Sequence, residues 1–304
     1  MTSTLLTDTR RPTVAAPAIR TKGELRVALR DARRAGRTIG LVPTMGYLHE
    51  GHLSLIRAAR AECDLVVMSL FVNPTQFGPG EDLDRYPRDE ERDLRLAAEA
   101  GADLVFAPPV TEVYAADAAT AVEVAGPLTD VLDGDPERRG PEHFRGVTIV
   151  VAKLFNIVGP DVAYFGQKDA QQAVVIRRMA RDLDFPVRIE VLPTVREPDG
   201  LAMSSRNGYL EPADRERATA LSRALAAAER GARSDSLAAG LQAARAELAA
   251  AAIEPEYLEA RDAETLEPVD RLGERPVLVA LAARLGAARL IDNVLIQPTN
   301  VPNT

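Results

Sequence analysis

Apolar and polar positions alternate in two ways along the first two thirds of the chain. Residues 22–35 place apolar side chains at helical spacing, and a short apolar run over 38–42, closed by Pro43, is typical of a buried strand. Further strands are expected at 65–72, 103–107, 162–165 and 187–192, and further helices from about 53 through Cys63 and at 90–100, 147–157 and 170–183. Strands separated by helices predict a Rossmann-like, doubly wound parallel sheet of the α/β class, with helices on both faces.

The pattern changes after Pro193. A polar turn over 196–200 is followed by two Ala-rich helical stretches, at 212–230 and 236–252, and then by three strand-like runs, at 257–260, 277–283 and 290–296. This order predicts a smaller α+β unit. We therefore expect two domains: a Rossmann-like domain over 1–194, in which 1–18 form a loose tail, and a C-terminal α+β lid domain over 195–304.

The composition is that of an ordinary globular protein, with 46% hydrophobic and 27% charged residues. The net charge of −8 argues against a nucleic-acid partner, because such surfaces need clustered basic residues. The longest apolar stretch, over 65–72, is too short to span a bilayer, and residues 1–18 lack the sustained apolar segment of an export signal. We expect a cytoplasmic protein without a membrane partner, in which the single cysteine, Cys63, is a small buried hydrophobe.

Two of the three histidines lie where the strand at 38–42 gives way to a helix, in Pro43-Thr-Met-Gly-Tyr-Leu-His49-Glu-Gly-His52. Free backbone N–H groups and the helix dipole favour an anion there, and side chains three positions apart share a face. The spacing differs from the His-Glu-x-x-His pattern of zinc helices. A pair of satisfied structural histidines is the simpler alternative, but the junction and its glycines favour contact with one phosphate group.

Three more polar segments carry candidate chemistry. In Phe-Gly-Gln-Lys168-Asp169, Lys168 could reach the β- and γ-phosphates of a nucleotide and Asp169 could cap the following helix. In Phe-Val-Asn73-Pro-Thr-Gln76-Phe, the amides suit a small substrate with a carboxylate and hydroxyls. In Met-Ser-Ser-Arg206-Asn, two hydroxyls and a guanidinium suit phosphate oxygens. Taken singly, these segments read equally well as a surface lysine, a loop and a helix cap.

The His-x-Gly-His element resembles the nucleotidyltransferase and class I aminoacyl-tRNA synthetase superfamily, whose common chemistry is attack on the α-phosphate of ATP. The segment Met-Ser-Ser-Arg206-Asn looks like the counterpart of that superfamily's Lys-Met-Ser-Lys-Ser loop. All four segments together, in this order, are similar to the pantothenate synthetase family over about 22–296. Tyr47 stands where that family usually has Ala, and Gln167 where Glu is common.

This resemblance implies an ATP-dependent ligase of pantothenate and coenzyme A biosynthesis that joins pantoate to β-alanine through a pantoyl adenylate, with AMP and pyrophosphate as products. It implies Mg²⁺ as a cofactor and a homodimer. The catalytic groups would be His49, His52, Lys168 and Arg206. The residues expected to bind ATP are Met45, Gly46, His49, His52, Gly166, Gln167, Lys168, Asp169, Val195, Met203, Ser204, Ser205 and Arg206, and those expected to bind pantoate are Asn73, Gln76 and Gln172, with Gln76 also placed near β-alanine.

Two other functions stay open at this point. An adenylyltransferase of the same superfamily would transfer AMP to a phosphorylated acceptor, although the uncharged amides at 73–76 favour a substrate without phosphate. A non-catalytic nucleotide sensor would bind ATP without releasing pyrophosphate. A dehydrogenase or a P-loop enzyme is disfavoured because the chain has neither Gly-x-Gly-x-x-Gly after a strand nor Gly-x-x-x-x-Gly-Lys.

Some residues receive no firm role from the sequence. The Mg²⁺ ligands are unassigned, and the acidic segment that contains Asp82, Asp84, Asp89 and Asp93 is interpreted as a solvated face. His143 lies in a polar stretch and is unassigned. The turn at 195–199 is a candidate hinge for closure of the C-terminal domain over the site, since an acyl adenylate needs protection from water.

Overall fold

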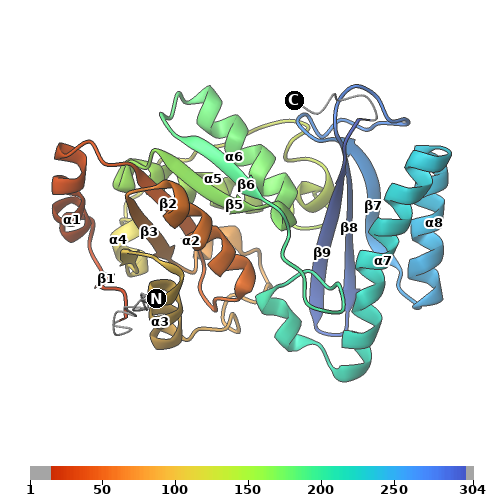
Figure 1. Ribbon diagram of the computed structural model, residues 1–304, viewed down its shortest axis with the longest axis horizontal. Helices are drawn as coiled ribbons and strands as arrows, with labels where there is room; N and C mark the ends of the chain where they lie inside the picture. The colour runs from red at the N-terminus through yellow and green to blue at the C-terminus, as the bar shows by residue number, and fades with distance from the viewer. Residues whose placement is uncertain (1–14, 299–304) are drawn as a thin grey trace, which may run out of the picture.

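The computed structural model describes residues 15–298, and a six-stranded parallel sheet occupies its N-terminal part (Figure 1). Its strands are β1 (Ala18–Ile19), β2 (Ile39–Thr44), β3 (Leu65–Leu70), β4 (Leu104–Phe106), β5 (Val162–Gly166) and β6 (Arg188–Leu192). The order is β1-β4-β3-β2-β5-β6, and every neighbouring pair is parallel. The chain order therefore reverses between β2 and β5, which in such sheets opens a ligand-binding crevice at the carboxyl ends of the strands.

Helices cover both faces of this sheet, as the sequence predicts. They are α1 (Lys22–Arg34), α2 (Glu50–Glu62), α3 (Glu90–Ala100), α4 (Val110–Val113), α5 (Pro141–Val158) and α6 (Ala170–Asp182). Successive strand residues point to opposite faces. Leu41 accordingly packs in the cluster that contains α1 and α5, whereas Val42 packs in the cluster that contains α2 and α3. Thr21 and Glu24 cap the start of α1 with a capping box, a pair of reciprocal hydrogen bonds between side chain and backbone.

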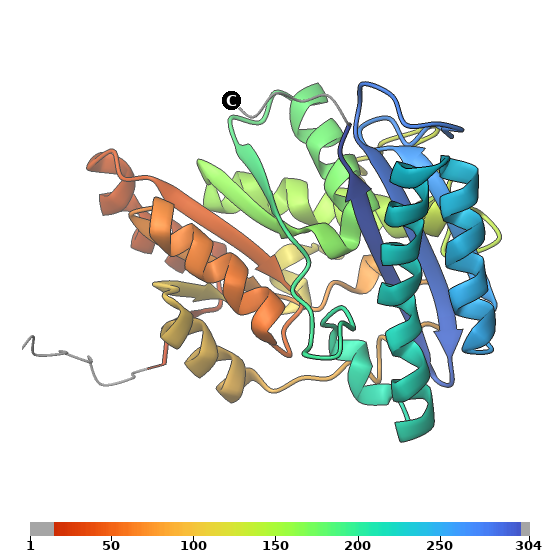
Figure 2. The same cartoon turned by 45° about the vertical axis from the view of Figure 1, so that its right-hand side comes forward.

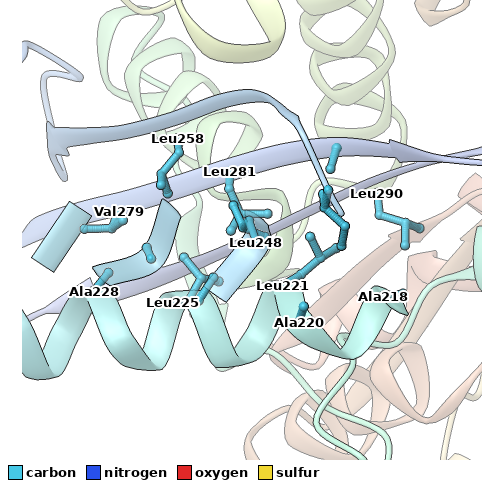
Figure 3. Close-up of a cluster of buried hydrophobic side chains, with 14 of the residues drawn as sticks. Ala218, Ala220, Leu221, Leu225, Ala228, Leu248, Leu258, Val279, Leu281 and Leu290 are labelled. Carbon is cyan, nitrogen blue, oxygen red and sulfur yellow. The ribbon is translucent and has the colours of Figure 1, made fainter. Parts of the chain in front are cut away.

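The C-terminal part is an antiparallel sheet of order β7-β8-β9 with two helices on its outer face (Figure 2). The elements are α7 (Pro212–Ser234), α8 (Leu237–Ala250), β7 (Pro255–Asp262), β8 (Val277–Leu285) and β9 (Ala288–Ile296). Leucines of both helices and alternate residues of the strands form its core (Figure 3). The helices approach closely, because a Cβ on Gly240 would lie only 2.3 Å from the carbonyl oxygen of Ala228. The small side chains of Ala and Gly at this crossing allow the backbones of the two helices to pack closely.

A further apolar cluster joins the two parts. It contains Val174 and Val175 of α6, Phe144 of α5, and Leu278 and Ala280 of β8. The inner face of the antiparallel sheet is thus covered by helices of the parallel-sheet part, whereas its outer face is covered by α7 and α8. A division of the chain into domains at residue 195, and a hinge there, stay predictions.

Several expected boundaries were wrong. The helix expected at 147–157 begins at Pro141, because proline fits the first turn of a helix and Gly140 leads into it with φ near 76°. The helix expected from about 53 begins at Glu50. Most of the loose tail expected over 1–18 lies outside the described residues, but Ala18 already pairs with Val105 of β4. No helix among residues 15–298 is both long and apolar enough to cross a bilayer.

Candidate active site

One cavity lies where the carboxyl ends of the parallel strands meet the inner face of the C-terminal sheet. The loops after β2, β3, β5 and β6 line it, together with one face of α5 and residues of β7 to β9. Fourteen of the predicted site residues line this cavity: Met45, His49, His52, Asn73, Gln76, Gly166, Lys168, Asp169, Gln172, Val195, Met203, Ser204, Ser205 and Arg206. Gly46 and Gln167 do not line it. The fold therefore gathers segments that are up to about 160 positions apart.

The histidine pair lies at the first turn of α2. The ring centroids of His49 and His52 are 4.1 Å apart, and the backbone N–H of His49 donates to Nδ1 of His52 over 3.4 Å. The proton of neutral His52 is therefore on Nε2. Burial lowers the pKa of His49 to about 4 and that of His52 well below its usual range, with the neighbouring Lys168 contributing to both shifts. Both rings are thus neutral near pH 7, and each offers one N–H rather than a positive charge.

The loop before these histidines is held tightly. Gly46 has φ of 89°, where a side chain would be strained, and a Cβ there would lie 2.6 Å from Leu70. A Cβ on Gly51 would lie 2.9 Å from the His49 ring. The motif glycines therefore allow the loop to pack against β3 and allow the His49 ring to lie over the helix start.

Asp93 anchors the same loop, contrary to the prediction that the acidic segment is a solvated face. Its carboxylate is 1% exposed and accepts hydrogen bonds from the backbone N–H of Tyr47, at 2.7 Å, and of Leu48, at 2.8 Å. Burial raises the pKa of Asp93, while these two N–H groups act in the opposite direction. The prediction failed because Asp93 lies on the inner side of α3, which a run of acidic residues concealed.

Cations and hydroxyls gather at another side of the cavity. The Arg206 guanidinium binds both carboxylate oxygens of Asp82, at 3.0 and 2.9 Å, so Asp82 is not a solvated residue either. The Lys168 ammonium lies 3.7 Å from the carboxylate of Asp169. The Ser204 hydroxyl accepts a hydrogen bond from the backbone N–H of Arg206 and caps the short helix that follows. The interpretation of this segment as a helix cap is therefore also correct. Asp169 holds the N-cap position of α6 without the expected capping hydrogen bond.

The amide side of the cavity is a closed hydrogen-bond network. The Asn73 side-chain amide donates to Oε1 of Gln76 and to the carbonyl oxygen of Gly146, both at 3.0 Å. The hydroxyl of Tyr114 donates to Oδ1 of Asn73 at 2.8 Å. Gly146 is required here, because a Cβ at that position would lie 2.2 Å from the carbonyl oxygen of Thr75. Helix α5 therefore holds the predicted substrate loop against its own backbone.

Sequence reasoning missed a second group of cavity residues. Arg139 and His143 line the cavity beside Gln76, whose carbonyl oxygen is 2.8 Å from Nδ1 of His143. Burial lowers the pKa of His143 to about 4. The polar stretch around 135–143 carries no spacing that distinguishes these residues from surface charges, so no sequence signal was available.

The C-terminal sheet also reaches the segment that contains Gln167 and Lys168. The Asn293 side-chain amide donates to the carbonyl oxygens of Gln167, at 2.9 Å, and of Lys168, at 3.0 Å. The side chain of Gln167 donates back to Oδ1 of Asn293 at 3.0 Å, which explains why Gln167 does not line the cavity. The adjacent Asp292 pairs with Arg196. These partners lie about a hundred residues or more apart in the chain, which is why the sequence did not predict them.

Neither the cysteine nor any group of possible metal ligands forms a second site within the described residues. Cys63 is buried, as expected, and its sulfur lies 3.5 Å from the hydroxyl of Tyr164. Within residues 15–298, no three side chains of His, Cys, Asp or Glu are grouped so that they could hold a metal ion.

Comparison with known proteins agrees with this geometry. The family model for pantoate-beta-alanine ligase matches residues 17–295. The chain belongs to the pantoate–β-alanine ligase family. It is 57% identical to a pantothenate synthetase of Moorella thermoacetica over 274 residues, which cover 88% of this chain and 93% of that protein.

Solved structures of the family have the same fold. The pantothenate synthetase of Thermus thermophilus matches with a TM-score of 0.86 at 49% identity, covering 93% of this chain and 100% of that one. The pantoate-beta-alanine ligase of Francisella tularensis, complexed with beta-gamma ATP and beta-alanine, matches with a TM-score of 0.76 at 32% identity, covering 92% and 98%. Membership of this ligase family confirms the resemblance that the four sequence motifs carry and the predicted fold class.

Proposed function

We propose that this protein is a pantoate–β-alanine ligase that makes pantothenate in two steps within the one cavity. In the first step, a carboxylate oxygen of pantoate attacks the α-phosphorus of ATP, the bond to the bridging oxygen breaks, and pyrophosphate leaves. In the second step, the neutral amine of β-alanine attacks the carbonyl carbon of the pantoyl adenylate, AMP leaves, and the nitrogen loses a proton. No covalent bond to the protein is needed, so the absence of an activated nucleophile among the proposed site residues is expected.

The proposed phosphate site consists of the histidine pair and the cationic side. His49 and His52 each donate one N–H to phosphate oxygens, because burial keeps both rings neutral. Lys168 and Arg206 supply the positive charge and Ser204 and Ser205 supply hydroxyls. Held in a shielded cavity, such donors stabilise the charge that grows on the phosphate oxygens in the transition state. Gly166, Asp169, Val195 and Met203, together with Met45, would surround the ribose and adenine.

ATP would have to compete with carboxylates that already bind these cations. Asp82 holds Arg206 through two hydrogen bonds and Asp169 lies beside Lys168. Mg²⁺ prefers carboxylate and phosphate oxygens, so these two carboxylates fit a Mg²⁺ ion that arrives with ATP. Bound there, Mg²⁺ would neutralise charge on the phosphate oxygens. The same exchange would free the guanidinium of Arg206 for the triphosphate.

Pantoate would bind on the amide side. Asn73 and Gln76 are oriented by their hydrogen-bond network, and Gln172 lines the same cavity. The apolar face of α5, with Val147, Val150 and Val151, offers a surface for the dimethyl part of pantoate. Amides rather than cations at this position favour an acceptor without phosphate, which distinguishes the ligase from an adenylyltransferase.

The C-terminal part would protect the adenylate from water. We propose that residues 195–304 act as a lid that turns near 195–199, with the apolar cluster around Leu278 as its contact in the closed form. Covalent crosslinks that hold this part away from the parallel sheet would then stop turnover, and unchanged turnover would contradict the lid.

We propose further that the enzyme is a homodimer that acts in the cytoplasm. Sedimentation equilibrium at micromolar concentration would measure the first property, since a mass near 32.8 kDa would contradict a dimer.

The convergence of the histidine pair, Lys168 and Arg206 on one cavity that also holds Asn73 and Gln76 carries this proposal. The test is pyrophosphate release from Mg-ATP after addition of D-pantoate, first without and then with β-alanine. Release that depends on pantoate, followed by AMP and pantothenate when the amine is added, is the expected outcome. Release only with a phosphorylated acceptor would identify an adenylyltransferase, and no release would leave a nucleotide-binding protein.

A further inference from the structure

The cations that line the cavity do not all belong to the proposed phosphate site. Three such side chains line it in the described part of the chain: Arg139, Lys168 and Arg206. The last two are on the side with the serine hydroxyls. Arg139 also borders a second pocket with Lys168 and Arg206, but its guanidinium is held next to Gln76, and its side chain is only 17% exposed. A guanidinium that is largely removed from water at a substrate cavity needs an anionic partner.

The contacts of Arg139 show how this guanidinium is oriented. Its Nε and Nη2 donate to the two carboxylate oxygens of Glu81, at 3.0 and 2.8 Å. Nη2 also donates to the carbonyl oxygen of Gln76 at 3.3 Å, and Nη1 lies 3.1 Å from Nε2 of His143. These four hydrogen bonds leave one of the five N–H groups of Arg139, on Nη1, without a partner among residues 15–298.

His143 acts as a fixed acceptor for this arginine. A guanidinium can only donate, so Nε2 of His143 must be unprotonated and its proton must be on Nδ1. Nδ1 then donates to the carbonyl oxygen of Gln76 at 2.8 Å. The imidazole is neutral, in agreement with its lowered pKa. Gln76 is thus tied to Arg139 through its backbone and to Asn73 through its side chain.

The proposed reaction has one charge that needs such a partner throughout. The pantoate carboxylate becomes a mixed anhydride and then an amide, so its negative charge disappears. The carboxylate of β-alanine takes no part in bond making and remains charged from substrate to product. A persistent counter-charge is therefore useful for β-alanine alone, and the residue that supplies it must lie away from the triphosphate.

We propose that Arg139 binds the carboxylate of β-alanine and that His143 and Gln76 position its guanidinium for this role. Glu81 shows that this guanidinium binds a carboxylate with two parallel hydrogen bonds, and the substrate carboxylate competes with Glu81 for them. The proposal requires the Glu81 carboxylate to move aside; Glu81 follows two glycines, Gly78 and Gly80, the second with φ of 82°. This inference rests on the ligase activity proposed above.

The first experiment needs no variant. The wild-type protein is supplied with Mg-ATP and pantoate, and kcat/KM is compared for β-alanine and for 3-aminopropanamide, which has nearly the same size and the same amine but a neutral amide in place of the carboxylate. A preference for β-alanine on the order of a hundredfold is expected, as for a desolvated charge pair. Equal use of the two amines would overturn the proposal whether or not any variant folds.

The second experiment assigns the preference to a residue. Arg139→Gln should lower kcat/KM for β-alanine on the order of a hundredfold through KM and leave the use of 3-aminopropanamide nearly unchanged, so that the preference disappears. Arg138→Gln is the matched control, because Arg138 is the neighbouring arginine but does not line the main cavity. Its variant should keep the wild-type preference. Retention of the preference by Arg139→Gln, or its loss in Arg138→Gln, would overturn the assignment.

Pantoate-dependent exchange of pyrophosphate into ATP, measured without any amine, separates this inference from the function on which it rests. Wild-type protein without exchange would contradict the ligase. Exchange that persists in Arg139→Gln while the amine preference disappears supports the carboxylate site. Loss of exchange in a folded Arg139→Gln protein would show that Arg139 serves the first step, which overturns its restriction to β-alanine.

Discussion

The parallel sheet and the C-terminal antiparallel sheet both border the cavity, but they contribute to it in different ways. Parallel strands end at a common edge, so the loops after β2, β3 and β5 bring His49, Asn73 and Lys168 together. The antiparallel sheet offers mainly a wall, with apolar side chains of β8 and the polar pair Asp292 and Asn293 of β9. From this difference we expect the reacting groups to follow strands of the parallel sheet and the antiparallel sheet to support and enclose them.

The largest expected effect is in the loops of the parallel sheet. Lys168→Ala should reduce pantoate-dependent pyrophosphate release on the order of a thousandfold, about 4 kcal/mol, because a preorganised charge at the phosphates is lost. Lys22→Ala is the control, since Lys22 begins α1 and its ammonium lies near Glu112 on the surface. If both variants release pyrophosphate at the wild-type rate, the phosphate site is misassigned.

A core substitution in the other half should affect stability rather than chemistry. Leu221 of α7 is 1% exposed in the core of the antiparallel sheet and does not line the cavity. Leu221→Ala should lower the free energy of unfolding by about 3 kcal/mol in denaturant titrations while kcat per folded molecule stays near that of the wild type. Leu183→Ala is the control, because Leu183 is 51% exposed, and it should change the free energy of unfolding by less than about 0.5 kcal/mol. A large fall in kcat for Leu221→Ala would mean that the two halves do not divide as described.

Acid sensitivity from histidines should arise only in the parallel-sheet half, because His49, His52 and His143 all lie there. The folded-state pKa of His143 is lowered to about 4 from its ordinary value of 6.5, so the unfolded chain binds the proton more strongly between these pH values. Stability is therefore complete above pH 6.5 and falls as the pH drops towards 4.

His143→Gln tests this contribution. Between pH 7 and pH 5, His143 should account for a loss of about 2 kcal/mol in the free energy of unfolding. The variant should be less stable than the wild type at pH 7, but the difference in its stability between the two pH values should be smaller by that amount. An unchanged pH dependence, measured by denaturant titration at both pH values, would mean that His143 is accessible to protons in the folded protein.

The smallest expected effect is at the contact between the C-terminal sheet and the segment that contains Lys168. Asn293→Ala removes two hydrogen bonds to the backbone of the Lys168 loop and should lower kcat/KM about fivefold, or about 1 kcal/mol, with KM for ATP affected most. Asn156→Ala is the control, because its amide donates only to Ala152 one turn earlier in α5. Wild-type kinetics for Asn293→Ala would show that the antiparallel sheet is a wall without a positioning role.

The fold class and most residues of the candidate site could be predicted from the sequence. The strand and helix patterns are local, and strand ends in a parallel sheet necessarily meet at one edge, so His49, Asn73 and Lys168 could be placed together in advance. Where local signals conflicted, prediction failed. Asp93 was placed in solvent because a run of charged residues hides its position on the buried face of α3, which it shares with Ala97 and Ala100. The start of α5 was placed at the first apolar run, although Gly140 and Pro141 mark its true beginning.

Only the tertiary structure decided the rest. The sequence by itself determined which side chains carry charge and which strand each follows, since these properties depend on neighbours a few residues away. It could not determine that the neutral ring of His143 accepts a hydrogen bond from Arg139, or that Asn293 supports the loop of Lys168. Those arrangements depend on burial and on partners that folding brings together from distant positions. The charge state of the histidines and the orientation of Arg139 are consequences of packing. Burial shifts a pKa and orients a guanidinium only after the core has formed.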